Sequence, residues 1–506
     1  MTKDRVVVVG AGVGGLTAAA DLARRGADVV VLDSALRPGG KMRHVQGGGV
    51  GIDAGPTVFT MRWIFQSLFE DAGQRLEDNL ELISADLLAR HAWRAGGQLD
   101  LFADIDKSAD AIGAFAGADN ARGYRAFCAR SAGMYRTLKS SFIGAERPSV
   151  LDLTRRIGLS NLDQLWAISP MKTLWPALGE HFSDPRLRQL FGRYATYVGS
   201  SPLLAPATMM LVAHVEQDGV WLVKGGMVQV AEALQQLGES QGARYRFGAH
   251  VSEITIERGR ASGVTLASGE HIAADAVMFN GDVSALAHGL LGNAANRAAP
   301  KTERSDRSLS AITWCVHAAT SGFELARHNV FFAENYPAEF EAVFRRRDIV
   351  EAPTVYVCAQ DRGHGAQSEP GTAERLLILI NAPADGDQRA FDANQFQERT
   401  FALLRDCGLT VHKTMQNSVA TTPTEFNQLF PGTGGALYGR ANHNAFASFK
   451  RPGATSALPG LYLAGGSVHP GPGVPMAAMS GRLAAARLLD DLTVMRGAKR
   501  QTVVFD

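Results

Sequence analysis

The N-terminal part of the chain alternates between short apolar runs and a stretch with helical spacing. Arg5 to Gly10 is rich in β-branched residues, which predicts a buried strand of a parallel sheet. Leu16 to Arg25 has the spacing of a helix, Gly26 ends it, and Asp28 to Leu32 predicts a second strand. This order of strand, helix and strand is the unit from which doubly wound parallel sheets are built.

Similar patterns recur in two remote parts of the chain. Lys224 to Glu257 predicts a glycine turn, a helix and a strand, and Ala261 to Asp282 continues as short strands. Leu461 to Ala486 combines an apolar run, a turn rich in glycine and proline, and a helix that begins near Met476. We therefore expect a nucleotide-binding domain of the Rossmann type, assembled from three segments: residues 1–80, 220–290 and 425–506.

The two intervening segments are expected to form a substrate domain, which makes the fold α/β overall. Residues 81–219 are predicted to be mainly helical and to face a membrane. Residues 291–424 are predicted to contribute a mixed sheet, with strands at Leu309 to Ala318, Thr354 to Cys358 and Leu376 to Asn381.

A glycine motif follows the first predicted strand. Gly10, Gly12 and Gly15 have the G-x-G-x-x-G spacing. The first glycine permits a tight turn, the second lets the backbone approach a pyrophosphate, and the third lets helix and strand pack closely. Asp33, 18 residues after Gly15, is positioned to accept hydrogen bonds from the ribose of an adenosine. The combination predicts a dinucleotide cofactor.

Composition excludes several other classes of function. The net charge of +1 over 506 residues gives no basis for nucleic-acid binding. The four cysteines are far apart, so neither a disulfide framework nor a metal site is expected. Glycines interrupt the first apolar run, which argues against a signal peptide. No apolar run reaches the ~20 residues that cross a bilayer, so membrane contact would be peripheral.

Two more motifs follow Asp33 and indicate which cofactor is bound. The first is a turn with a basic residue (Gly39, Gly40, Lys41), and the second is a D-x-G-P stretch (Asp53, Gly55, Pro56). In these motifs, and over nearly its whole length, the chain resembles the flavin-dependent amine oxidase and phytoene desaturase superfamily. The resemblance implies FAD rather than NAD. It also implies that Lys41 and Arg43 lie close to the pyrophosphate, although a solvated pair is an equal alternative.

The same resemblance extends to the C-terminal segment. In that superfamily a late strand, turn and helix closes over the flavin, which implies cofactor contacts from Gly465, Gly466, Gly473, Val474, Pro475 and Met476. A helix N-terminus stabilises the negative charge of a reduced flavin by ~0.3–1 kcal/mol. The resemblance further implies that the backbone near Val251 contacts the adenine.

Segments such as DAGPTVFTMR and PGVPMAAMSGR are most similar to one subgroup, the 1-hydroxycarotenoid 3,4-desaturases of phototrophic bacteria. This similarity implies formation of a C3–C4 double bond in an acyclic 1-hydroxy or 1-methoxy carotenoid. A hydride would move to flavin N5, a proton would leave the neighbouring carbon, and oxygen or a quinone would accept the electrons. A substrate drawn from a bilayer implies a peripheral protein on the cytoplasmic face of the membrane.

Two local features have alternative interpretations. His469 is the best-placed proton acceptor by sequence, but the favoured interpretation is that it holds its turn by a backbone hydrogen bond. Between residues 120 and 160, eight Arg or Lys residues and several aromatic residues accompany only two acids. This segment fits an anionic membrane surface, but an ordinary solvated helix face is the favoured interpretation.

Several rival functions remain at this stage. An ordinary phytoene desaturase differs only in detail, and a redox-neutral carotenoid isomerase would use the same fold. A flavin oxidase of amines or porphyrinogens is less compatible, because the C-terminal turn lacks the cysteine or acid usual in amine oxidases. The intact glycine turns argue against a non-catalytic lipid-binding protein similar to the GDP-dissociation inhibitors.

Overall fold

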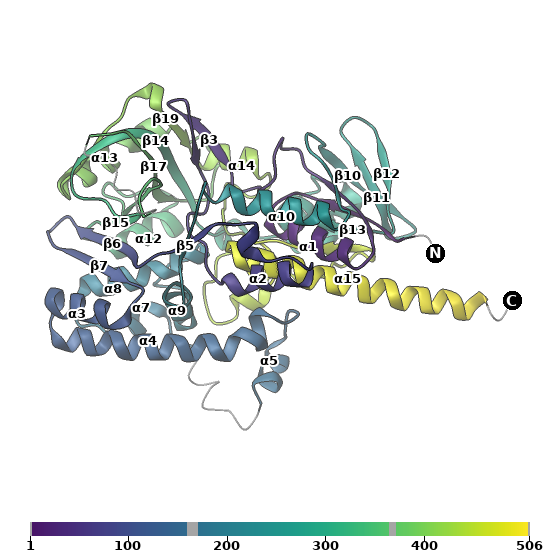
Figure 1. The fold of residues 1–506 in the computed structure, drawn as a ribbon, viewed down its shortest axis with the longest axis horizontal. Helices are drawn as coiled ribbons and strands as arrows, with labels where there is room; N and C mark the ends of the chain where they lie inside the picture. Colours follow the sequence, from purple (N-terminus) through teal and green to yellow (C-terminus); the bar gives the residue numbers. More distant parts are fainter. Residues whose placement is uncertain (1–2, 159–170, 364–370, 504–506) are drawn as a thin grey trace.

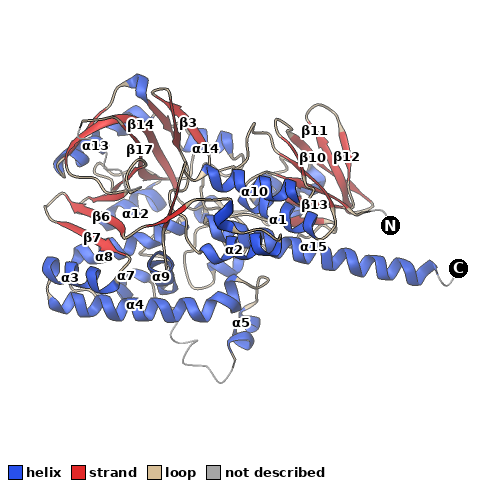
Figure 2. Ribbon diagram, viewed as in Figure 1, coloured by secondary structure: helices blue, strands red, loops and turns tan. Residues whose placement is uncertain are grey.

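The computed structural model describes residues 3–158, 171–363 and 371–503, and it contains two groups of strands separated by helices (Figure 2). One group forms a five-stranded parallel sheet in the order β20-β13-β1-β2-β9. Its strands are β20 (Leu461–Leu463), β13 (Ala276–Phe279), β1 (Arg5–Val9), β2 (Asp28–Leu32) and β9 (Arg244–Arg246). The three predicted segments therefore do meet in one Rossmann-type sheet, and the predicted α/β fold is confirmed.

Three helices pack together beside this sheet. They are α1 (Val13–Arg24), α10 (Val228–Ser240) and α15 (Val474–Val503). The apolar faces of these helices and of β1 and β2 form one hydrophobic core. Helix α15 runs far beyond the body of the molecule, toward the C-terminus (Figure 1). A small antiparallel sheet projects beyond β13 and consists of β10 (Val251–Glu257), β11 (Arg260–Leu266) and β12 (His271–Ala273).

The second group of strands forms an eight-stranded mixed sheet. It contains the three strands predicted for residues 291–424, observed as β14 (Ser310–Gly322), β16 (Val355–Ala359) and β17 (Glu374–Ala382). The other members are β15 (His328–Phe332), β18 (Leu409–His412), β19 (Ser418–Thr421), β6 (Leu87–Trp93) and β7 (Gln98–Phe102). The last two lie in the segment predicted to be mainly helical. They enter the sheet because β6 pairs in parallel with β15.

Shorter elements connect the two domains. A hairpin of β3 (His44–Gly47) and β4 (Val50–Asp53) lies against the large sheet, and β5 (Leu82–Ser84) pairs with β8 (Trp221–Val223). Further helices are α2 (Arg62–Asp71), α11 (Val283–Ala287), α12 (Tyr336–Glu341), α13 (Ala393–Asp406) and α14 (Pro423–Leu429). The exact boundaries of the five predicted domain segments stay predictions.

A layer of helices lies below the large sheet in Figure 1. It comprises α3 (Ile105–Ala116), α4 (Ala118–Leu138), α5 (Val150–Ile157), α7 (Leu174–Leu178), α8 (Pro185–Gly192) and α9 (Leu211–Gln217). The longest, α4, turns Tyr124, Phe127 and Tyr135 into the protein core. Arg122, Arg125 and Arg130 of the same helix pair with acids, as Arg125 does with Asp106. This arrangement favours the ordinary solvated face for α4. Within the described parts of the chain, none of the helices combines the length and apolarity needed to span a membrane.

Candidate active site

A cavity of about 1520 Å³ lies between the nucleotide-binding domain and the large sheet. Both predicted glycine turns line it: the N-terminal turn through Gly10, Gly12 and Gly14, and the C-terminal turn through Pro472 to Met476. Remote parts of the chain therefore form one site. Its volume exceeds the 300–1,000 Å³ typical of a small-molecule pocket, so it has room for a cofactor and a second large ligand.

The N-terminal glycine turn is packed so closely that its glycine positions leave no room for a Cβ atom. Gly10 has a φ of +103°, and a Cβ on Gly15 would lie 2.1 Å from the Gly10 carbonyl oxygen. Asn280, directly after β13, donates to that carbonyl at 3.1 Å. A Cβ on Gly12 would lie 2.9 Å from the same amide nitrogen. Gly15 does not itself line the cavity, in agreement with a packing role.

A second glycine turn lies directly beside the first one. The Gly39 N–H donates to the Ala11 carbonyl at 2.9 Å, and a Cβ on Gly40 would lie 3.3 Å from the Gly12 Cα. Gly39 and Gly40 have φ angles of +120° and +58°. Both line the cavity. The two turns therefore form a cradle of bare backbone next to the first turn of α1, whose leading N–H groups have no partner within the helix.

Asp33 stands at the end of β2 and lines the same cavity. Its carboxylate oxygens accept hydrogen bonds from the backbone N–H groups of Ala11 (2.6 Å) and Ala35 (2.7 Å). Burial nevertheless raises the pKa of Asp33, since removal from water is the largest influence on this carboxylate. The Asp33 carbonyl accepts the Ala249 N–H at 2.8 Å, which brings the lining residue Val251 to the same end of the cavity.

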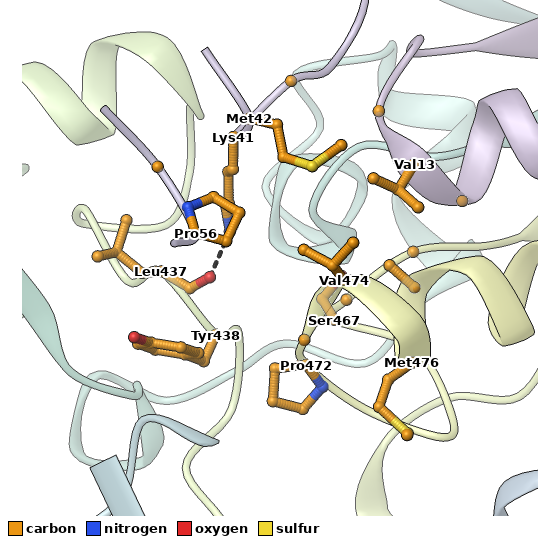
Figure 3. A pocket seen from close by; sticks show the side chains of 18 of the residues that line it. Val13, Lys41, Met42, Pro56, Leu437, Tyr438, Ser467, Pro472, Val474 and Met476 are labelled. Atoms are coloured by element: carbon orange, nitrogen blue, oxygen red, sulfur yellow. Dashed lines mark hydrogen bonds between the residues drawn. The ribbon is translucent and has the colours of Figure 1, made fainter. Parts of the chain in front are cut away.

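Lys41 and Arg43 line the cavity, but neither is a freely solvated side chain. Lys41 donates to the Leu437 carbonyl at 2.6 Å, and Figure 3 shows this bond beside Pro56. Burial lowers the pKa of Lys41. Arg43 donates to the Thr421 hydroxyl at 3.0 Å. Both side chains hold the late segment 421–437 against the second glycine turn, and their contact with a pyrophosphate stays a prediction.

Asp53, predicted to bind the cofactor, does not line the cavity. Its carboxylate accepts the Met227 N–H at 2.7 Å and contacts the His44 ring at 2.8 Å. The Gln360 side chain pairs with its backbone N–H and C=O. Within the D-x-G-P stretch, Asp53 therefore joins the start of α10 to the large sheet, and only the residues after it reach the cavity. Gly55 and Pro56 reach the cavity wall, and a Cβ on Gly55 would lie 1.9 Å from the Lys41 carbonyl oxygen.

The C-terminal turn supplies the opposite wall. All six of its predicted contact residues line the cavity: Gly465, Gly466, Gly473, Val474, Pro475 and Met476. Figure 3 shows Val474 and Pro472 across the pocket from Pro56 and Lys41. Sequence reasoning missed the residue that braces this turn. Arg451 is only 1% exposed and donates to the carbonyls of Tyr438 (3.1 Å) and Gly466 (3.3 Å). Burial lowers its pKa to about 10.

His469, the predicted proton acceptor, is buried and absent from the cavity wall. Its Nε2 lies 3.0 Å from the carbonyl oxygens of Phe142 and Ala145, so this nitrogen must carry the hydrogen. Burial lowers the pKa of His469 to about 4, which keeps the ring neutral. The geometry favours the alternative role, in which the histidine holds the C-terminal turn against the helical layer.

The half of the cavity formed by the substrate domain is mainly apolar. Its lining side chains include Leu138, Phe142, Leu153, Val212, Val215, Val330 and Leu377, and Phe449 of the C-terminal segment adds to this apolar wall. Lining positions in the other half carry the glycine cradle and Asp33. The residues present therefore fit a dinucleotide with a pyrophosphate at one end, beside a long apolar ligand at the other.

Comparisons with known proteins identify the family of the chain and its cofactor. The model of the flavin containing amine oxidoreductases matches residues 13–489, and the chain belongs to that family. A putrescine oxidase variant and the cyclohexylamine oxidase of Brevibacterium oxydans share the fold, with TM-scores of 0.59 and 0.55 at 15% and 17% identity. This chain covers 97% of its length in both comparisons, and 99% and 100% of theirs. FAD is accordingly the cofactor for which the glycine cradle is built.

Relatives with much higher sequence identity carry names that indicate a class of substrate. The chain is 53% identical over 504 residues to the hydroxyneurosporene desaturase of Rubrivivax gelatinosus, covering 99% of this chain and 96% of that one. It is 42% identical to the hydroxyneurosporene desaturase of Rhodobacter capsulatus, over 96% and 98% of the two chains. A 1-hydroxycarotenoid 3,4-desaturase of a Flavobacterium species is 30% identical, over 95% and 98%.

Proposed function

We propose that this protein is an FAD-dependent desaturase that introduces the C3–C4 double bond into an acyclic 1-hydroxy or 1-methoxy carotenoid. The observation that carries the proposal is the large apolar compartment that adjoins the glycine cradle in a single cavity. Apolar burial contributes ~25 cal/mol per Å², so a long polyene gains ample binding energy there. The names of the relatives, in particular hydroxyneurosporene desaturase, support this substrate class.

The chain's own residues would bind the cofactor, orient the substrate and exclude water from the site. The glycine cradle and the start of α1 would hold the pyrophosphate, and Asp33 would accept the ribose hydroxyls. Bound FAD supplies an acceptor for the hydride that leaves the substrate. Leu437, Tyr438 and Val474 line the cavity, and with the two ligands bound they would limit the access of water to the apolar compartment. Because the resulting cation is delocalised over the polyene, a weak base suffices to take the proton, and oxygen or a quinone removes the electrons.

Expression in a bacterium that accumulates either neurosporene or 1-hydroxyneurosporene tests the function directly. We expect the hydroxylated pigment to gain one double bond, seen as absorption at longer wavelength and a mass lower by two hydrogens. A changed spectrum with unchanged mass would indicate an isomerase. Conversion of neurosporene or phytoene alone would indicate an ordinary desaturase.

The remaining rivals need only the purified protein. Peroxide release with amines or porphyrinogens would indicate an oxidase of those substrates. A colourless protein that binds no added FAD would indicate a lipid-binding relative without flavin chemistry.

We further propose that the protein takes its substrate from a membrane surface at α5. This helix exposes Val150 (46%) and Leu151 (69%), while its Leu153 lines the cavity. Phe446, 50% exposed, lies next to the lining residue Ala445. Arg155 and Arg156 add positive charge to the same helix, which suits anionic lipids. An apolar surface around the cavity gives the polyene a route that avoids water.

Leu151→Glu should weaken binding to vesicles that contain anionic lipid and slow conversion of membrane-bound carotenoid. A single buried leucine contributes ~1.5–3 kcal/mol, so binding should fall by roughly tenfold or more. Ile105→Glu, on α3, is the matched control because it is also an exposed apolar residue. Equal vesicle binding by both variants and the wild type would rule out α5 as the membrane contact.

A further inference from the structure

The apolar compartment contains a buried cluster of charged and polar side chains around Arg193. Arg193, at the start of a 3₁₀ turn (Arg193–Val198), lies 3.7 Å from the Glu216 carboxylate of α9. Tyr197 donates to the same carboxylate at 3.0 Å, and Tyr194 also donates to it. Arg193 donates to the Tyr197 hydroxyl through Nη1. Arg193, Tyr197 and Glu216 line the cavity.

Two nitrogens of the Arg193 guanidinium have no hydrogen-bond acceptor in this cluster. Its side chain is only 6% exposed, yet Nε and Nη2 have no hydrogen-bond partner among the described residues. Buried N–H groups without an acceptor are costly, and this cost is greater for a charged group. An arginine cannot lose its charge to avoid that cost. Arg193 lines the cavity and holds these unpartnered N–H groups at its wall.

A second unpartnered atom lies in the same compartment. Thr57, next to Pro56, forms a 2.7 Å hydrogen bond with the Tyr356 hydroxyl, which forms another with His328 Nδ1. His328 lines the cavity and is 4% exposed, and within the described part of the chain its Nε2 has no partner. Burial is the main cause of the low pKa of His328, followed by the positive charges of Arg327 and Arg193. Arg193 and His328 both line the cavity.

The charge balance of the cluster selects the kind of group that it binds. Glu216 already neutralises Arg193, so a carboxylate or phosphate would also meet the negative charge of Glu216. A neutral oxygen has no such repulsion and can accept from Arg193. A hydroxyl or a methoxy group is therefore the fitting ligand, and the surrounding apolar walls hold the hydrocarbon to which it is attached.

We propose that Arg193, supported by His328, binds the oxygen on C1 of the carotenoid end group and thereby selects oxygenated substrates. This inference rests on the proposed function. The oxygen lies only two carbons from C3, so its binding site must adjoin the place where the flavin meets the C3–C4 bond. The series of hydrogen bonds from Thr57 through Tyr356 to His328 begins beside Pro56, at the predicted flavin turn. Binding at C1 would thus fix which bond of the polyene reacts.

The decisive experiment compares a hydroxylated and a hydrocarbon substrate in paired variants. Arg193→Met combined with Glu216→Gln removes both charges and leaves no unpaired buried ion. We expect kcat/KM for 1-hydroxyneurosporene to fall by about ten- to hundredfold, the usual value of a hydrogen bond to a charged group. Activity on neurosporene, which has no oxygen to lose contact with, should fall much less, so the preference for the hydroxylated substrate should narrow. His328→Leu, which keeps the charge pair, should lower the same preference by a smaller factor.

Val330→Ala is the matched control, because it widens the same compartment without removing a donor. It should affect both substrates alike. The inference is overturned if the double variant and His328→Leu bind full FAD yet keep the wild-type preference, or lose both activities equally.

Binding measurements separate this failure from failure of the proposed function. Quenching of tryptophan fluorescence reports polyene binding without turnover. If the wild type desaturates neither pigment but binds the hydroxylated one more tightly, and the double variant does not, the oxygen site stands while the desaturase proposal falls. Equal binding of both pigments by wild type overturns the oxygen site.

Discussion

Three side chains brace the cavity without contributing a chemical step: Asn280, which is half-buried, and Arg451 and His469, which are buried. Asn280 joins the N-terminal glycine turn to β13, Arg451 donates to three carbonyls around the C-terminal turn, and His469 links that turn to the helical layer. Each satisfies backbone carbonyls that would otherwise be buried without a donor. Sequence reasoning found only His469, because a histidine near a flavin suggests acid–base chemistry.

His469→Ala should therefore act through the fold. Two buried carbonyls would lose their donor, which costs about 1–3 kcal/mol of stability. We expect bound FAD and desaturation to fall together, so that turnover per bound flavin stays within a factor of about two. Flavin absorbance, thermal unfolding and pigment conversion measure the three quantities. A variant with full FAD content but much lower turnover would restore the catalytic assignment.

At the scale of elements, the contact between α1 and α15 brings the two flavin turns together. The helices approach so closely that a Cβ on Gly481 would lie 2.2 Å from the Gly14 carbonyl oxygen. Arg482 adds a 3.1 Å contact to the buried Asp21 of α1. Because α15 begins at the C-terminal turn and α1 at the N-terminal turn, the separation of these helices sets the width of the cavity between them.

Gly481→Ala should push α15 away from α1. Overpacking of this kind costs about 1–3 kcal/mol, and we expect weaker FAD binding together with a lower unfolding temperature. Gly133→Ala in α4 is the matched control, since a Cβ there meets nothing within 4 Å. If the two variants are equally stable and bind FAD equally well, the helix contact does not control the cavity.

At the scale of the whole molecule, burial of neutral histidines links stability to pH. His91, His328 and His469 are each less than 5% exposed. Burial is the largest influence on all three: it lowers the pKa of His91 well below its ordinary value, that of His328 to about 3 and that of His469 to about 4. Between these values and the unfolded pKa of about 6.5, the unfolded chain binds more protons than the folded one.

Stability should therefore be complete above about pH 6.5 and fall as the pH is lowered toward 4. At pH 5 each histidine withdraws up to about 2 kcal/mol of stability. Urea unfolding at pH 8 and pH 5 measures the difference, and His469→Ala should show a shallower dependence. An unfolding midpoint that does not change between these two pH values would contradict the assignment of neutral buried histidines.

Short-range patterns in the sequence were enough to predict the first turn of the nucleotide-binding domain and the kind of cofactor it holds. Strand periodicity, the spacing of Gly10, Gly12 and Gly15, and the position of Asp33 depend on near neighbours in sequence, so they predict the turn without a structure. The superfamily resemblance then indicated FAD and the return of the C-terminal segment. These features are local because each turn must present its own backbone to the same cofactor.

Tertiary structure alone decided which polar residues face the cavity and which brace it. Asp53 and His469 have motif positions like those of cofactor contacts, yet long-range partners, including the start of α10 and carbonyls in 142–145, turn them away from the cavity. Arg193, Glu216 and His328 have no shared motif, and they line one cavity only when the 3₁₀ turn, α9 and β15 pack around it. Spacing along a chain cannot reveal such a cluster, because its geometry is fixed by the packing of elements that are remote in sequence.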